Sequence, residues 1–147
     1  MFRSFMPQAL EEARAAARRG EVPVGAVVTR GAAVLARAGN RTRELADPTA
    51  HAEMLAIRAA CAALGQERLA DCAIWVTLEP CAMCAQAIAH ARLARLHFGA
   101  ADPKSGGVLH GARVFAHPQT HHVPEVQDGL VAEECAALLR DFFLSRR

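Results

Sequence analysis

The sequence predicts an α/β fold of three layers, in which a mixed central sheet has helices on both faces. Segments of good helix formers alternate along the chain with short segments rich in β-branched residues, and this alternation is typical of such folds. The 147 residues are enough for one hydrophobic core, and 52% of them are hydrophobic against 22% charged, as in globular proteins. We therefore expect residues 1–147 to form a single domain. The order of its strands is not evident from the sequence.

The chain is expected to begin with a helix and a hairpin. Residues Pro7–Arg19 are mostly Ala, Leu and charged residues, and Gly20 supplies a helix stop. Two segments with β-branched residues, Val22–Thr29 and Val34–Ala38, flank a short turn that contains Gly31. This arrangement predicts two strands that pair with one another.

The middle of the chain is predicted to contain two helices with one strand between them. A polar loop over residues 39–48 ends in Asp-Pro and leads into a helix over about 50–64, with Thr49 as its N-cap. The segment Ala73–Leu78 has the composition of a strand. A second helix is expected over Pro80–Ala91, because proline is tolerated in the first helical turn.

The last third of the chain is predicted to hold a strand, a loop and a helix. The strand covers Arg95–Gly99. Residues Asp102–Pro118 contain three glycines and two prolines, which indicates an irregular loop with a short helical piece at most. A final helix is expected to start at Asp128 as its cap and to extend to Arg147. Its apolar faces are formed by Leu130, Leu138, Leu139, Phe142 and Phe143.

Charge and composition exclude several classes of protein. The formal net charge of +2 and the pI near 8.4 are well short of the positive field of proteins that coat nucleic-acid backbones. No segment has the apolar length of a signal peptide or of a membrane span, so we expect a cytoplasmic protein that does not contact membranes. The five cysteines include one Cys-x-x-Cys pair, which favours metal binding over a disulfide framework.

Two short motifs indicate a chemical function. The triplet His51-Ala-Glu53 opens the second predicted helix, and Pro80-Cys81-x-x-Cys84 runs from the end of a strand into the next helix. A His-x-Glu triplet arises by chance about half the time in a chain of this composition, whereas the chance of Pro-Cys-x-x-Cys is on the order of one in a hundred. Together the motifs predict a functional site where two helices begin.

The residue types suit a catalytic zinc ion. Cys81 and Cys84 are three positions apart, so on a helix they share a face, and the helix N-terminus favours their thiolates. His51 makes three protein ligands and leaves the fourth tetrahedral position for water, as in catalytic zinc sites. Glu53 is the natural proton carrier. Residues two apart on a helix point to nearly opposite sides, so His51 and Glu53 share the site only if the helix begins at or between them.

Other functions of these motifs stay open at this point. The Cys-x-x-Cys pair also fits a redox dithiol, and a structural zinc site would take a fourth ligand from Cys61, Cys72, Cys135 or another histidine. A zinc-stabilised binding module is a third alternative. We expect the three remaining cysteines to be small buried hydrophobic residues, because they lie among alanines and leucines. No partner at ligand spacing is found for His90, His97, His110, His117, His121 and His122.

The two motifs resemble those of the cytidine deaminase superfamily, whose zinc deaminases carry His-x-Glu followed by Pro-Cys-x-x-Cys. Within that superfamily, nearly the whole chain resembles the bacterial tRNA-specific adenosine deaminases. The matching segments are Val22-Pro-Val-Gly25, Asn40, Asp-Pro-Thr-Ala-His-Ala-Glu, Val-Thr-Leu-Glu-Pro-Cys-x-Met-Cys, Phe98-Gly-Ala-x-Asp102-x-Lys104, Phe142-Phe143 and Arg146-Arg147. This resemblance implies a cytidine-deaminase-like fold.

The resemblance also implies an activity, which is hydrolytic deamination of the wobble adenosine in a tRNA anticodon loop to inosine, with zinc-activated water as nucleophile. It implies a homodimer with one Zn²⁺ per subunit, held by His51, Cys81 and Cys84, and Glu53 as the catalytic proton carrier. Asp102 is also compatible with a simple turn residue. The residues expected to contact the RNA substrate are Asn40, Asp102, Lys104, Phe142, Phe143, Arg146 and Arg147.

One alternative enzyme shares every metal and proton residue of this hypothesis. A deaminase of free nucleobases or nucleosides, of the guanine or cytosine type, carries the same core motifs. The segment Phe98–Lys104 and the final helix, which ends in phenylalanine and arginine, both favour an RNA substrate.

Overall fold

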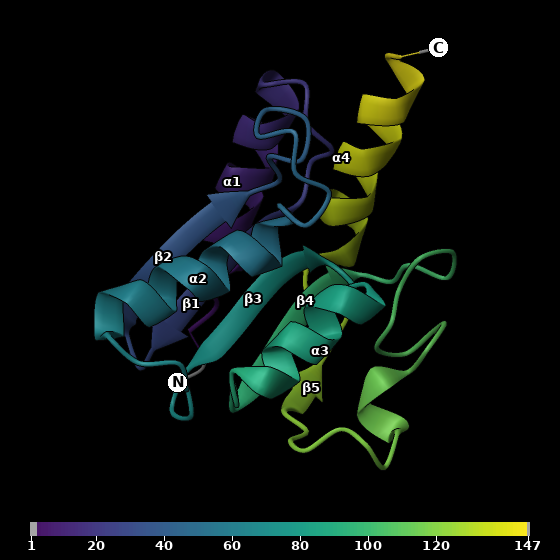
Figure 1. The fold of residues 1–147 in the computed structure, drawn as a ribbon. Coiled ribbons are helices and arrows are strands. Elements are labelled where there is room, and N and C mark those ends of the chain that lie inside the picture. The colour runs from purple at the N-terminus through teal and green to yellow at the C-terminus, as the bar shows by residue number, and fades with distance from the viewer. Residues whose placement is uncertain (1–2, 147) are drawn as a thin grey trace.

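The computed structural model describes residues 3–146 and shows helices packed around a five-stranded sheet (Figure 1). The first elements are α1 (Met6–Arg18), β1 (Gly25–Arg30), β2 (Ala33–Gly39) and α2 (Ala52–Leu64). They are followed by β3 (Ala73–Leu78), α3 (Ala82–His90), β4 (Arg95–Ala100), the 3-10 helix η1 (Val114–Ala116), β5 (Glu125–Gln127) and α4 (Ala132–Leu144). No helix within residues 3–146 is long and apolar enough to cross a membrane.

The sheet is mixed, with the strand order β2-β1-β3-β4-β5. Strand β1 is antiparallel to both β2 and β3, whereas β3, β4 and β5 run parallel. The predicted hairpin is confirmed, although its first strand begins at Gly25 rather than at Val22. A Cβ atom on Gly25 would collide with the backbone of Ala9 and Ala13. Glycine therefore allows α1 to lie directly on the strand.

Two helices cover each face of the sheet, which confirms the predicted three-layer arrangement (Figure 1). Successive side chains of a strand point to opposite faces. In β3, Ile74 and Val76 accordingly join the core beneath α2 and α3, and Trp75 joins the core beneath α1 and α4. Both cores are close-packed, so the strand ends that carry functional side chains have fixed positions.

The start of α2 differs from the sequence-based expectation. Thr49 was the expected N-cap, but its backbone N–H and its hydroxyl both donate hydrogen bonds to Asp47, at 2.8 and 2.7 Å. The N-cap is His51, which has extended backbone angles, and the helix begins at Ala52. Asp47 and Thr49 therefore form a turn that leads the chain into the helix.

The last part of the chain differs in two respects. Asp128 does not cap α4, whose N-cap is Val131, because the chain first bonds back to β4 through Gly129 and Leu130, which donate to the Gly99 and Phe98 carbonyls. Strand β5 was not predicted, since its three residues are all exposed and have no apolar alternation. The short helical piece expected in the preceding loop is η1.

Candidate functional site

Two helix N-termini meet where the sequence motifs place the site. His51 is the N-cap of α2, and Cys81 is the N-cap of α3, each with an extended backbone. The prediction that α3 starts at Pro80 is therefore wrong by two residues. Cys81 lies just outside the helix, and Cys84 lies in its first turn, where it is fully buried. The partial positive charge of both helix ends is directed at these ligand atoms.

The three side chains form one compact cluster. The Nδ1 atom of His51 lies 3.6 Å from the Cys81 sulfur and 3.5 Å from the Cys84 sulfur, and all three ligand atoms are within 4.8 Å of one another. Tetrahedral zinc with bonds of about 2.3 Å to sulfur and about 2.0 Å to nitrogen separates these atoms by roughly 3.5 Å. The observed spacing thus fits a metal ion bound by one nitrogen and two sulfur atoms.

The ionisation of these three side chains also fits a metal site. A hydrogen bond from the Cys84 thiol lowers the pKa of Cys81 to about 4 against the effect of burial, and His51 adds to this lowering. The same hydrogen bond, together with burial, raises the pKa of Cys84, while the hydrogen bond to Cys81 raises the pKa of His51. A bound dication would favour the thiolate form of both sulfur atoms.

Glu53 lies beside this cluster, as the second residue of α2 and only 4% exposed. Because the helix begins after His51, that residue does not follow the helical rotation, and both side chains reach the same place. Burial, reinforced by the Cys81 sulfur and opposed by the backbone and by His51, raises the pKa of the Glu53 carboxyl to about 7. This pKa suits a group that accepts and returns a proton at neutral pH.

Asn40 is placed next to the cluster at the end of β2. Its side-chain oxygen accepts a hydrogen bond of 2.8 Å from the backbone N–H of Ala52. This contact satisfies one of the free N–H groups at the start of α2. The structure thus shows Asn40 supporting the helix end that carries His51.

Asp102 and Lys104 lie in the segment that follows β4. The Asp102 carboxylate accepts hydrogen bonds from the backbone N–H groups of Lys104 and Ser105, at 3.2 and 2.9 Å. Asp102 is half-buried, and Lys104 is exposed. The geometry shows Asp102 as the residue that closes this turn and leaves the Lys104 side chain in solvent.

The C-terminal aromatic residues have different environments. Phe142 is 7% exposed and packs edge-on against Phe143, which is 54% exposed. The Arg146 guanidinium stacks over Phe142 at 3.7 Å from the ring centre, a cation–π contact. Phe143 lines a shallow apolar cavity beside Arg140 and the end of β4. Arg147 lies outside the described residues.

The other cysteines are not gathered at the cluster. Cys72 and Cys135 are each 1% exposed, as expected, whereas Cys61 is only half-buried. Burial raises the pKa of both Cys72 and Cys135 to about 11, so these thiols stay protonated and unreactive. Within residues 3–146, none of them contributes a fourth ligand to the cluster.

Two residues near the cluster were missed from the sequence. Glu79, whose side chain is completely buried, precedes Pro80 and accepts a hydrogen bond of 2.8 Å from His110. Burial opposes ionisation of Glu79, but hydrogen bonds from Asp102 and His110 outweigh it and lower its pKa. The only signal in the sequence is an acidic residue at the end of an apolar strand, and it does not reveal that His110 is the partner.

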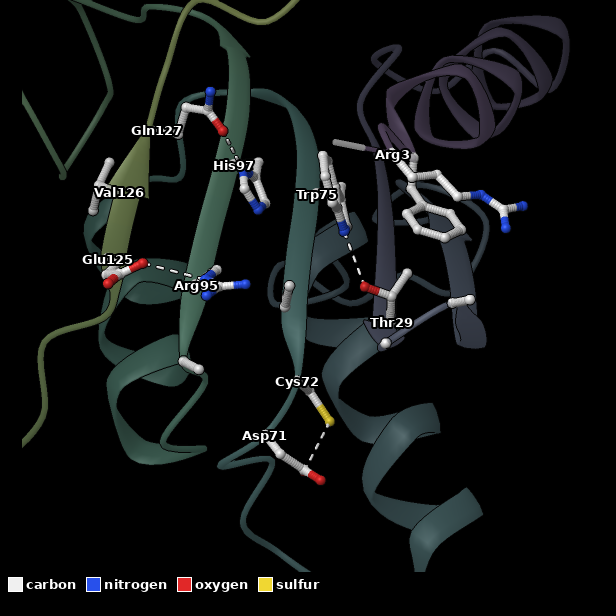
Figure 2. Close-up of a pocket in the computed structure, with 15 residues that line it drawn as sticks. Arg3, Thr29, Asp71, Cys72, Trp75, Arg95, His97, Glu125, Val126 and Gln127 are labelled. Carbon is white, nitrogen blue, oxygen red and sulfur yellow. Dashed lines mark hydrogen bonds and ion pairs between the residues drawn. The ribbon is translucent and has the colours of Figure 1, made fainter. Parts of the chain in front are cut away.

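One cavity lies away from this chemistry. Its volume is about 530 Å³. Cys72, just before β3, and Arg95, the first residue of β4, line it (Figure 2), whereas the metal cluster lies beyond the other end of β3. Trp75 and His97 form its floor as a stacked pair with ring centres 3.8 Å apart, and Arg95 and Glu125 form an ion pair at its rim (Figure 2). The cavity contains none of the residues of the two motifs.

Known deaminases match this chain in sequence and in structure. The model of the MafB19-like deaminase family matches residues 2–147. A tRNA-specific adenosine deaminase of Agrobacterium fabrum is 57% identical over 143 residues, which are 97% of this chain and 94% of that protein. A solved structure from studies of A-to-I editing by tRNA:A34 deaminases has a TM-score of 0.90 at 57% identity, covering 92% of this chain and 98% of the other. Guanine deaminase of Bacillus subtilis has a TM-score of 0.65 at 30% identity, covering 97% and 91%.

Proposed function

Because this chain belongs to the MafB19-like deaminase family, and within it to the tRNA-specific adenosine deaminases, we propose that it converts the wobble adenosine of a tRNA anticodon loop to inosine. The observation that carries this proposal is the cluster of His51, Cys81 and Cys84 with buried Glu53 beside it. Residues 1–147 act as a single deaminase domain. A loop substrate is already single-stranded, so presenting one base to the site costs little.

The metal we assign to the cluster is zinc, one ion per subunit. One nitrogen and two sulfur ligands at tetrahedral spacing are typical of zinc, and a site with three protein ligands is typical of catalysis rather than of structure. When bound, the ion supplies an activated water, because coordination lowers the pKa of water to about 7.

Glu53 moves the protons of the reaction. Its carboxyl is buried beside the cluster, with a pKa raised by burial to about 7. It takes a proton from the attacking water and delivers it to N1 of the adenine. It then takes the remaining hydroxyl proton from the oxygen added at C6 and passes it to the amino group, which leaves as ammonia while that oxygen becomes the carbonyl of inosine. Burial excludes bulk water from Glu53, so that it exchanges protons with the substrate rather than with solvent.

Residues beside the cluster and further from it bind the RNA. We assign contacts with the target nucleotide to Asn40, and contacts with its neighbours to Asp102 and Lys104. The exposed Phe143 ring offers a surface for base stacking, and Arg146, held over Phe142, offers a cation for a phosphate. The protein acts as a homodimer in the cytoplasm.

Deamination of a free base is less well supported. The guanine deaminase of Bacillus subtilis shares the fold, at 30% identity and a TM-score of 0.65. The corresponding values for the tRNA:A34 deaminase structure are 57% and 0.90. These differences favour the tRNA substrate over the free base.

The proposal is tested with a purified, zinc-loaded protein and an anticodon stem-loop that carries adenosine at the wobble position. We expect inosine from the wild type, none from Glu53→Gln, and normal yield from Glu67→Gln, which changes an exposed carboxyl in the same way. A zinc-loaded wild type that gives no inosine but releases ammonia from guanine would overturn the tRNA assignment.

A further inference from the structure

Hydrogen-bond donors of segment 102–110 surround Glu79. This segment is distant in sequence from the metal ligands and belongs to no helix or strand. One carboxylate oxygen accepts from the Asp102 backbone N–H at 3.0 Å and from the His110 ring at 2.8 Å. The other accepts from the backbone N–H groups of Val108, Leu109 and His110, at 3.1, 2.9 and 3.1 Å. The Glu79 side chain has no exposed area. One buried carboxylate thus satisfies both ends of segment 102–110.

These backbone groups have no alternative partner in a strand or helix. Segment 102–110 is irregular, and a buried N–H without an acceptor costs about 1–3 kcal/mol. The carboxylate therefore replaces the hydrogen-bond ladder that a regular element would supply. Because its two oxygens together accept from donors at both ends of the segment, the carboxylate fixes the position of the segment as well as stabilising it.

Segment 102–110 also presses against the turn that carries the metal ligands. The Gly107 backbone N–H donates to the Pro80 carbonyl at 2.8 Å, and a Cβ atom on Gly107 would lie 2.5 Å from the Ala82 nitrogen and 2.8 Å from the Cys81 carbonyl carbon. A Cβ atom on Gly106 would lie 2.5 Å from the Glu79 carboxyl group. Both glycines are required by this close approach.

We propose that Glu79 is a positioning residue for the RNA substrate. It holds segment 102–110 against the metal-binding turn, so that Asp102 and Lys104 stand at a fixed place beside the reacting base. Glu79 touches neither the metal nor the base, and it acts through the segment alone. This role rests on the function proposed above, because Asp102 and Lys104 are assigned there to the nucleotides next to the target.

The substitution Glu79→Gln tests this role with almost no change in shape. If the amide oxygen of Gln replaces the oxygen that serves Val108, Leu109 and His110, its NH₂ group faces the Asp102 N–H. Two donors then oppose one another, and the Asp102 end of the segment loses its anchor. Glu125→Gln is the matched control, since the Glu125 side chain is 80% exposed at the sheet edge.

The first readout is steady-state kinetics on the anticodon stem-loop. We expect Glu79→Gln to raise KM about tenfold or more while kcat stays within about threefold, the pattern of lost uniform binding. Zinc per chain, measured by elemental analysis, should equal that of the wild type and of Glu125→Gln. A fall in kcat at unchanged KM, or a loss of zinc, would overturn the inference, because Glu79 would then support the metal turn itself.

The second readout is hydrogen exchange, which needs no substrate. In Glu79→Gln the amides of segment 102–110 should exchange at least about tenfold faster, and those of α2 at the wild-type rate. Unchanged exchange in the segment overturns the inference whether or not the wild type makes inosine. Gly106→Ala crowds the same carboxyl from the other side, so it should give the same exchange pattern if Glu79→Gln does not fold.

Discussion

The side-chain oxygen of Asn40 lies 2.8 Å from the backbone nitrogen of Ala52, the first residue of α2. The contact joins the end of the hairpin to the helix start beside His51. A residue that the family resemblance assigns to the substrate therefore also holds the fold together at the site. The hydrogen bond alone predicts how substitution of Asn40 changes stability, whatever its role in substrate binding.

Asn40→Ala should lower the free energy of unfolding by about 1 kcal/mol, the usual cost of losing a helix N-terminal acceptor. Asn40→Asp keeps an acceptor and places a negative charge at the helix N-terminus, so it should retain most of the stability. Urea unfolding monitored by circular dichroism measures both. Equal losses in the two variants would contradict the assigned hydrogen bond.

The cluster predicts which cysteines bind zinc. Cys84→Ala should reduce the zinc content from about one ion per chain to a small fraction of that, and with it the deamination of the stem-loop. Cys135→Ala, at an equally buried cysteine outside the cluster, should keep its zinc even if it loses stability. Elemental analysis after dialysis distinguishes them, and zinc loss from Cys135→Ala alone would refute the ligand assignment.

His97 predicts how stability depends on pH. Burial lowers the pKa of its ring below the ordinary 6.5, the nearby Arg95 adds to this, and hydrogen bonding to Gln127 and the charge of Glu125 oppose it. The unfolded chain therefore takes up a proton at pH values where the folded protein does not. The contribution of His97 is present above pH 6.5 and is lost as the pH falls from 6.5 through the lower folded pKa.

His97→Phe should consequently show a shallower loss of stability between pH 7 and pH 5 than the wild type, even if it is less stable at pH 7. Denaturant midpoints across this range give the comparison. Identical slopes for the two proteins would show that His97 is not perturbed by its environment.

Val131 is a strained residue at the start of α4. Its φ of 46° and ψ of 41° lie in the left-handed region, which costs a β-branched residue roughly 1–2 kcal/mol. Val131→Gly should relieve this strain. The relief should outweigh the added entropy of the unfolded chain, so the free energy of unfolding should rise by about 0.5–1 kcal/mol. Val123→Gly, at an exposed valine without a positive φ, should destabilise slightly. A lower melting temperature for Val131→Gly than for Val123→Gly would contradict this prediction.

The sequence predicted what is encoded locally. The helices, the hairpin and the two motifs depend on residues near one another in the chain, and the requirement that α2 begin between His51 and Glu53 is met. The predicted cap Thr49 was wrong because its own N–H and hydroxyl bond to Asp47. The predicted cap Asp128 was wrong because Gly129 and Leu130, which follow it, first bond to β4. Strand β5 depends on pairing with β4 rather than on its own composition.

Interactions between residues that are far apart along the chain could not be predicted from the sequence. Glu79 and His110 are 31 positions apart, and nothing in either motif indicates that they meet. The same holds for Asn40 and Ala52, which appear as a loop residue and a helix residue. Strand order decides which loops become neighbours, and the sequence did not reveal that order.

The spacing of the metal ligands along the chain has a mechanical consequence. His51 and Cys81 are 30 residues apart, so an ion bound by both acts as a cross-link that closes a long loop. Closing that loop restricts the unfolded chain, and binding only the folded state adds stability that grows with the free ion concentration. Treatment with a chelator should therefore lower the melting temperature of the whole protein. In the cell, the supply of metal would set the fraction of the enzyme that stays folded.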